Sequence, residues 1–190
     1  IRTALILTSI LMFTAIGSRL GNTILAANAI LIILQMFISY SLDGFAQAAE
    51  VLIGNEYGKK NKDKIIKVTI ASGIISFLFA LIYSLLFYLF INDIIMLMTS
   101  IESVISEIQK YTIWIIISPL ISFLSFHMDG VFIGANKTKI MRNTVIISFI
   151  IFIISLYIFV PIYENHGLWF SFLLFLFFRG ILLLYKFNKI

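Results

Sequence analysis

Six long apolar segments separated by short polar connections account for most of the chain. The first uncharged run extends from Thr3 to Ser18 and the third from Val68 to Phe90. A helix needs about 20 apolar residues to cross a hydrocarbon layer. Open strands would leave backbone groups unsatisfied in lipid, and the polar–apolar alternation of a β-barrel is absent. The pattern therefore predicts an all-α membrane protein, a six-transmembrane-helix bundle with helices at approximately 2–18, 24–54, 64–91, 100–134, 141–160 and 167–186.

Composition supports the same class. Hydrophobic residues make up 61% of the 190 residues and charged residues only 12%, about half of what a soluble domain carries. Cys is absent, so disulfides and thiolate metal sites are excluded. The chain starts at Ile1 rather than Met, and apolar sequence follows almost at once. We therefore expect this chain to be part of a longer protein.

The basic residues are concentrated in alternate connections. Lys-rich connections of a membrane protein lie in the cytoplasm, which predicts that both ends of the chain are cytoplasmic. We therefore expect a multi-pass protein of the cell inner (plasma) membrane. These short runs lack interleaved aromatic residues, so the net charge of +5 does not indicate nucleic-acid binding. The basic residues assigned to the cytoplasmic side are Arg2, Lys59, Lys60, Lys62, Lys64, Lys67, Lys137, Lys139, Arg142, Lys186 and Lys189.

Four charged residues fall within the predicted helices, namely Asp43, Glu50, Asp129 and Arg179. Each charge costs roughly 2.5–3.5 kcal/mol in a membrane helix, so it needs a partner or a function. One hypothesis is a structural ion-pair cluster in which Arg179 neutralises one or two carboxylates and ties three helices together; its members are Glu50, Asp129, Arg179 and His127. The alternative is a relay that titrates during transport. The structural hypothesis is favoured for Glu50, Asp129 and Arg179, whereas Asp43 lies deeper and fits either.

Polar residues also form a stripe on the second helix. Gln35, Ser39 and Asp43 recur at i, i+4 and i+8 and so share one face, and Gln47 continues the spacing. Such residues form hydrogen bonds between helices or line a polar cavity. Both interpretations stay open, and the four residues are candidates for a cavity or coupling site.

Enzymatic and metal chemistry are not indicated. An intramembrane aspartyl protease needs two aspartates that meet and share a proton, but Asp43 and Asp129 lie towards the cytoplasmic side beside basic residues. No phosphate-binding loop, metal motif or Ser-His-Asp arrangement is visible. We therefore expect no enzyme activity, no cofactor and no metal.

Several segments resemble the multidrug and toxic compound extrusion (MATE) family, in particular its DinF-like branch. They are L-D-G-F-A-Q-A-A-E-V-L-I-G-N-E-Y-G (Leu42 to Gly58), M-D-G-V-F-I-G-A-N-K-T-K-I-M-R-N (Met128 to Asn143) and F-F-R-G (Phe177 to Gly180), together with R-T at Arg2 and Thr3 and S-R-L-G at Ser18 to Gly21. The resemblance covers essentially the whole chain. It implies that residues 1–190 are the C-terminal lobe of a pseudo-symmetric twelve-helix transporter whose N-terminal lobe is missing.

The resemblance also implies a function. Such transporters export bulky amphipathic or cationic compounds in exchange for protons or sodium ions, with protons preferred here. In this branch the coupling carboxylate lies in the other lobe, and the first helix here contains no acid between Thr3 and Ser18. We expect the partners to be the lipid bilayer, the missing lobe and a small substrate, and we expect one lobe alone not to transport. The alternative is a lipid-linked oligosaccharide flippase of the same superfamily, and a structural subunit is a third possibility.

Overall fold

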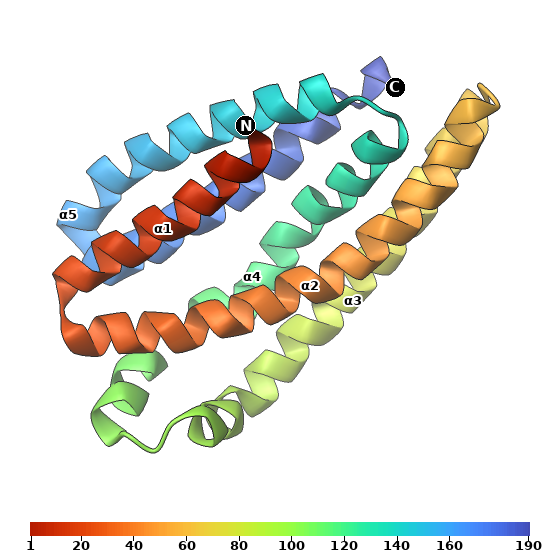
Figure 1. Cartoon of the computed structure of the whole chain (residues 1–190). Coiled ribbons are helices and arrows are strands. Elements are labelled where there is room, and N and C mark those ends of the chain that lie inside the picture. The colour runs from red at the N-terminus through yellow and green to blue at the C-terminus, as the bar shows by residue number, and fades with distance from the viewer.

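The computed structural model describes all 190 residues and is entirely helical (Figure 1). Five helices are long and apolar enough to cross a membrane. The predicted fold class, an all-α membrane protein, is confirmed. The elements are α1 (Arg2–Leu20), α2 (Asn22–Gly58), α3 (Lys62–Met98), α4 (Glu102–Gly134), α5 (Thr138–Tyr185) and a short 3-10 turn, η1 (Phe187–Lys189).

The fifth and sixth predicted helices form one element that folds back on itself. The reversal occurs at Glu164, whose backbone angles (φ 48°, ψ −123°) are not helical. A side chain at Gly167 would lie only 2.2 Å from the carbonyl oxygen of Phe159, so the two arms touch just beyond the bend. The predicted connection at 161–166 is therefore too long. The helix continues past Pro161 to the bend.

The third helix extends further than its predicted end near residue 91. Ile91 and Ile95 are both buried and lie one turn apart, so the packing face of α3 continues to Met98. Asn92 and Asp93 are exposed on the opposite side of the helix. Two polar residues therefore do not interrupt this helix, because they do not face the bundle.

Helix α4 is central to the bundle and packs against α2, α3 and α5, whereas α1 packs against α2 and α5. Pro119 lies inside α4 and removes one backbone hydrogen bond. The Ser84 hydroxyl of α3 donates to the Ile116 carbonyl at 2.7 Å, which satisfies part of the disturbed turn. The helix continues through the proline to Gly134.

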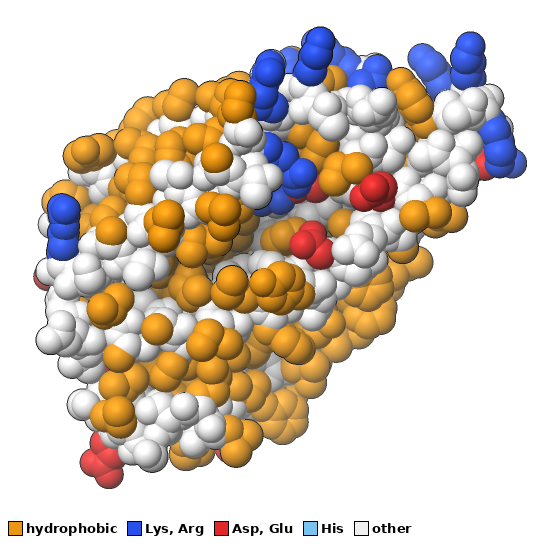
Figure 2. Space-filling view, in the orientation of Figure 1, with side chains coloured by type: hydrophobic (Ala, Val, Ile, Leu, Met, Phe, Trp, Pro, Cys, Tyr) orange, Lys and Arg blue, Asp and Glu red, His pale blue; other side chains and the backbone are white.

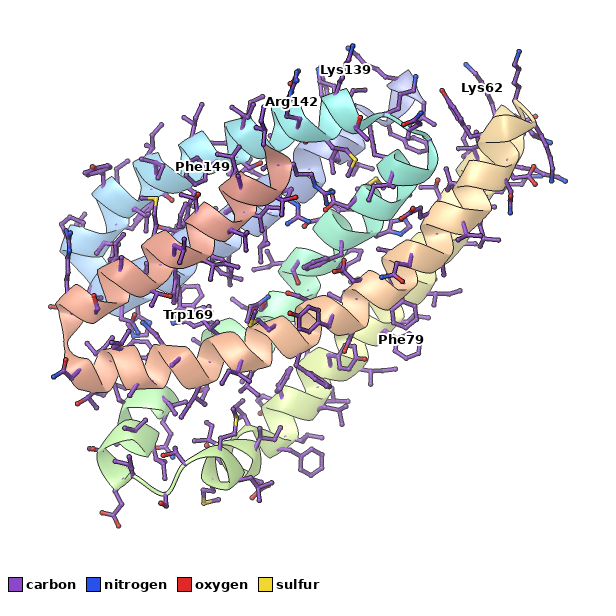
Figure 3. All side chains as sticks on the ribbon, in the orientation of Figure 1. Lys62, Phe79, Lys139, Arg142, Phe149 and Trp169 are labelled. Carbon is purple, nitrogen blue, oxygen red and sulfur yellow. The ribbon has the colours of Figure 1, made fainter.

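A buried polar cluster fixes the bend of α5 to the start of α2. Asn28 and Asn165 donate to each other's side-chain oxygens at 2.7 and 3.0 Å, and the indole nitrogen of Trp169 donates to Asn28 at 2.9 Å. All three side chains are buried. Figure 3 shows Trp169 inside the bundle, between the ribbons of α1, α2 and α5.

Most of the basic side chains gather at one end of the molecule, which we call the lysine-rich end. It comprises the α2–α3 connection, the α4–α5 connection and the carboxyl terminus. Lys62, Lys139 and Arg142 all lie there (Figure 3), and Figure 2 shows the blue side chains along the same edge. The two Lys-bearing connections thus emerge on the same side of the bundle.

The Asn28 cluster predicts a measurable loss of stability. Replacement Asn28→Ala leaves the Asn165 amide and the Trp169 indole without their partner in a buried site. We expect the free energy of unfolding to fall by about 1–2 kcal/mol, seen as a lower midpoint of thermal unfolding in detergent. Asn22→Ala, at an exposed position on the same helix, is the control and should leave the midpoint unchanged.

Candidate functional site

A groove of about 370 Å³ runs along the face formed by α1, α2 and α5. Figure 2 shows this face hollowed between α1 and α2, with basic and acidic side chains close together towards one end. Gln35, Ser39 and Asp43 of the predicted stripe line it. The opposite wall is mostly apolar and aromatic and includes Phe172 and Phe175 of α5. The groove therefore combines an apolar wall with one polar stripe and a few charges.

Asp129 holds two arginines at the inner end of this groove. Its Oδ2 accepts hydrogen bonds from Arg179 of α5 and from Arg2 of α1, the latter at 2.6 Å. The side chains of Asp129 and Arg179 are each only 5% exposed, whereas that of Arg2 is 32% exposed. The Arg179 guanidinium also lies 5.4 Å from the ring centre of Phe126. One carboxylate thus links α1, α4 and α5.

Glycines explain how these charges are buried. Gly130 follows Asp129, and a side chain there would lie 2.1 Å from the Ala46 carbonyl oxygen of α2. Gly134, one turn later, meets the Glu50 carbonyl in the same way. Gly180 follows Arg179 and lies against the backbone of Ser125 in α4. Small residues at this spacing let helix backbones approach closely, which excludes lipid and water from the ion pair between them.

The other members of the predicted ion-pair cluster lie elsewhere. Glu50 forms no ion pair, although it is half-buried on α2. His127 points towards α3, where its Nε2 lies 3.1 Å from the Thr69 carbonyl oxygen and against Gly73. The structure thus brings together Asp129 and Arg179 but not Glu50 or His127. Gly134 is both the last residue of α4 and a contact point between α2 and α4.

The stripe on α2 serves more than one purpose. The side-chain oxygen of Gln35 accepts a hydrogen bond from Ser118 of α4, and its amide nitrogen has no partner. Ser39 bonds only to the Gln35 carbonyl of its own helix, at 2.9 Å. Asp43 forms no ion pair. Gln47 is exposed and does not line the groove, so the stripe ends at Asp43.

Arg2 is the site residue that sequence reasoning missed. It was assigned to the cytoplasmic surface because it precedes the first apolar run. In the structure it is the first residue of α1, and it lines the groove while reaching Asp129. The two arginines and two aspartates of this region therefore balance when both carboxylates are charged. Pairing of Asp129 with more than one arginine could not be deduced from spacing along the chain.

Comparison with known proteins identifies related sequences. The family model described as MatE matches residues 1–158. DNA damage-inducible protein F of Escherichia coli (strain K12) is 36% identical over 168 residues, which is 88% of this chain and 36% of that protein. The chain thus spans little more than a third of the length of this curated relative.

Solved structures share the fold. An outward-facing multidrug resistance MATE family transporter of the MOP superfamily has a TM-score of 0.85 to this chain, and a MOP superfamily transporter from Pyrococcus furiosus has 0.84. A MATE in a bent conformation also has 0.84. The first two cover 98% of this chain and the third covers 97%, while this chain covers 42% of each. All three are 17% identical to it, so they establish a common fold.

The shared carboxylate predicts a non-additive response to mutation. Arg179→Leu leaves the buried Asp129 with only the partly exposed Arg2, so we expect a loss of about 3 kcal/mol and low abundance in the membrane. Arg2→Leu should cost about 1 kcal/mol, because this arginine reaches solvent. The double variant Asp129→Leu/Arg179→Leu removes both buried charges and should be more stable than Arg179→Leu alone. Thermal unfolding in detergent measures all four proteins. Normal stability of Arg179→Leu would contradict a structural role for the pair.

Proposed function

The chain belongs to the MatE family, and from this premise we propose that it is one lobe, the C-terminal one, of an ion-coupled efflux transporter. The activity we propose is transport of bulky amphipathic or cationic compounds and no enzymatic reaction. The observation that carries the proposal is the groove between α1, α2 and α5, which has an apolar wall, a polar stripe and an acid without an ion-pair partner. Alternating access requires two bodies that move around a shared cavity, and this lobe supplies one wall.

We propose that the lysine-rich end faces the cytoplasm of a cell whose inner (plasma) membrane contains the protein. The support is the gathering of the Lys-bearing connections on one side of the bundle (Figure 3). The other faces carry large apolar side chains, and many of these side chains are more than 50% exposed. Such a surface suits contact with lipid. Both ends of the chain are then cytoplasmic, because α5 crosses the membrane twice.

Asp43 is the residue that we propose attracts a cationic substrate. It lines the groove opposite aromatic side chains, a combination that binds amphipathic cations through charge and apolar contact. Asp129 lines no part of the groove and is already paired with both arginines. Gln35 adds an amide nitrogen without a partner. The coupling ion, preferably a proton, is expected to act on a carboxylate of the other lobe.

The flippase alternative needs basic groups that are free to hold pyrophosphate. Arg2 and Arg179 both line the groove, whereas the sequence indicated only Arg179. The additional basic residue favours this alternative. Both guanidinium groups, however, are bound to Asp129, and withdrawing either one would leave a buried charge less well paired. Export of cations is therefore the better-supported function.

The proposal predicts that transport depends on a second lobe. We expect proteoliposomes that contain this chain alone to show no ion-driven movement of a fluorescent cationic dye. Co-reconstitution with a six-helix amino-terminal lobe of the same transporter should restore movement, because both walls of the cavity are then present. Coupled transport by this chain alone would overturn the proposal.

The role of Asp43 is tested in the two-lobe transporter. Asp43→Asn removes one charge from the groove without changing its shape, so we expect about a fivefold higher KM for a monocationic substrate. A neutral substrate should be unaffected. Glu50→Gln is the matched control, since it neutralises an acid two turns along the same helix that does not line the groove. If transport of an anionic lipid-linked substrate depended on Arg2 and Arg179 while cations were not carried, the flippase alternative would be correct.

A further inference from the structure

A second cleft lies on the outer side of the bundle, between α3 and α4, and takes no part in the groove described above. Its volume is about 500 Å³ and its walls are almost entirely apolar. Ile66, Ile70, Ile74 and Phe77 of α3 form one wall, and all four are at least 40% exposed. Phe123 of α4 lies on the other side. Large apolar side chains along a cleft of this kind indicate an apolar occupant.

The length of the cleft matches one half of a bilayer. From Ile66 to Phe77 the α3 backbone rises about 16 Å, and half of the hydrocarbon core is about 15 Å thick. The cleft begins one turn after Lys62, at the lysine-rich end, and ends near the middle of the bundle. A single acyl chain of the leaflet at that end fits this depth.

The lysine-rich end of the cleft continues into a smaller pocket of about 190 Å³. The two share Ile66 and Phe187, and the smaller one reaches the side chain of Lys62. Figure 3 shows Lys62 at the tip of the molecule where α3 begins. Apolar cleft and basic tip thus form one continuous surface, as a lipid with a charged headgroup requires.

The first turn of α3 is suited to an anion. Lys62 forms no ion pair, whereas Lys59 of the same connection is bound to Glu56 at 2.9 Å, which lowers the pKa of the Glu56 carboxyl. The backbone amides of Lys62 and Asp63 have no hydrogen-bond partner, because Asn61 caps only the amide of Lys64. Asp63 opposes an anion, but Lys62 and the unpaired Lys64 outnumber it within the same turn.

We propose that this surface binds one anionic phospholipid of the leaflet at the lysine-rich end. One acyl chain lies in the cleft between α3 and α4, and the phosphate lies beside Lys62 and the free amides of α3. The inference rests on insertion of the protein in a membrane and not on transport. Basic pockets beside transmembrane helices recognise anionic headgroups in this manner. The bound lipid would fill the space that separates α3 from α4 at this end.

The test is native mass spectrometry of the full chain in detergent, titrated with phosphatidylglycerol or with phosphatidylcholine of the same acyl chains. We expect one phosphatidylglycerol to bind in preference to phosphatidylcholine. Lys62→Gln should weaken phosphatidylglycerol binding about fivefold, because one basic residue near the headgroup is lost. Ile70→Trp should block the cleft and weaken both lipids. If Ile70→Trp unfolds at a lower temperature than the parent chain, Ile74→Phe replaces it as the variant that narrows the cleft, and it should also weaken both lipids.

Two matched controls distinguish binding at this site from nonspecific attraction of anionic lipid to the basic end of the protein. Lys139→Gln removes the same charge from the same end, and Leu85→Trp adds the same bulk to α3 at a position as exposed as Ile70 (57% for both) but outside the cleft. Neither should alter binding. Equal binding of the two lipids, or an equal effect of Lys139→Gln and Lys62→Gln, would overturn the proposal. Competition by glycerol phosphate at the same concentration would also overturn it, since it would indicate a phosphate site that does not need the acyl chain.

Discussion

The burial of one carboxylate, Asp129, constrains the arrangement of the helices around it. A charge in this position is tolerated only when it is paired and enclosed, and both conditions depend on backbones that approach closely. Gly130 lets α2 come against α4, and Gly180 lets α5 come against α4 from another side. The ion pair between Asp129 and Arg179 then lies in the seam of the three helices. A side chain at either glycine would separate the helices and admit lipid or water to the charges.

The same seam determines the shape of the groove. Helix α1 packs against α2 and α5, and its link to α4 includes the ion pair between Arg2 and Asp129. At the opposite end of the bundle, the Asn28–Asn165 pair fixes α2 to the bend of α5. The groove therefore lies between two polar attachments, one at each end, with apolar packing between them. An arrangement of this kind holds the wall of a cavity in place while leaving its surface free for a ligand.

The sequence predicted the helical class, the family and the polar stripe on α2, because hydrophobic runs and i, i+4 spacing are local properties. It placed Asp129 and Arg179 among the embedded charges, and the structure pairs them. It could not show that Glu50 and His127 lie away from this ion pair, since spacing along a helix gives the depth of a residue and its face but not which neighbouring helix that face meets. Arg2 was missed for a related reason: a charge at the start of a helix looks like a surface charge until a buried partner is known. The sequence predicts a connection at 161–166, and the structure locates the reversal within it, at Glu164.

The two Asp-Gly pairs of this chain show how the same dipeptide acquires different roles. Gly130 lies against the backbone of α2, so Asp129 is sealed between helices and held by arginine. Gly44 has no atom beyond its own stretch of helix within 4 Å of the position a side chain would take, and Asp43 is half-buried without an ion pair. A carboxylate on an open helix face keeps its charge available, whereas one in a seam is already neutralised. Asp129 balances only one of the two arginines that line the groove, so the charge that a ligand meets on this wall is set by Asp43 and the remaining positive charge together with whatever faces them across the cavity.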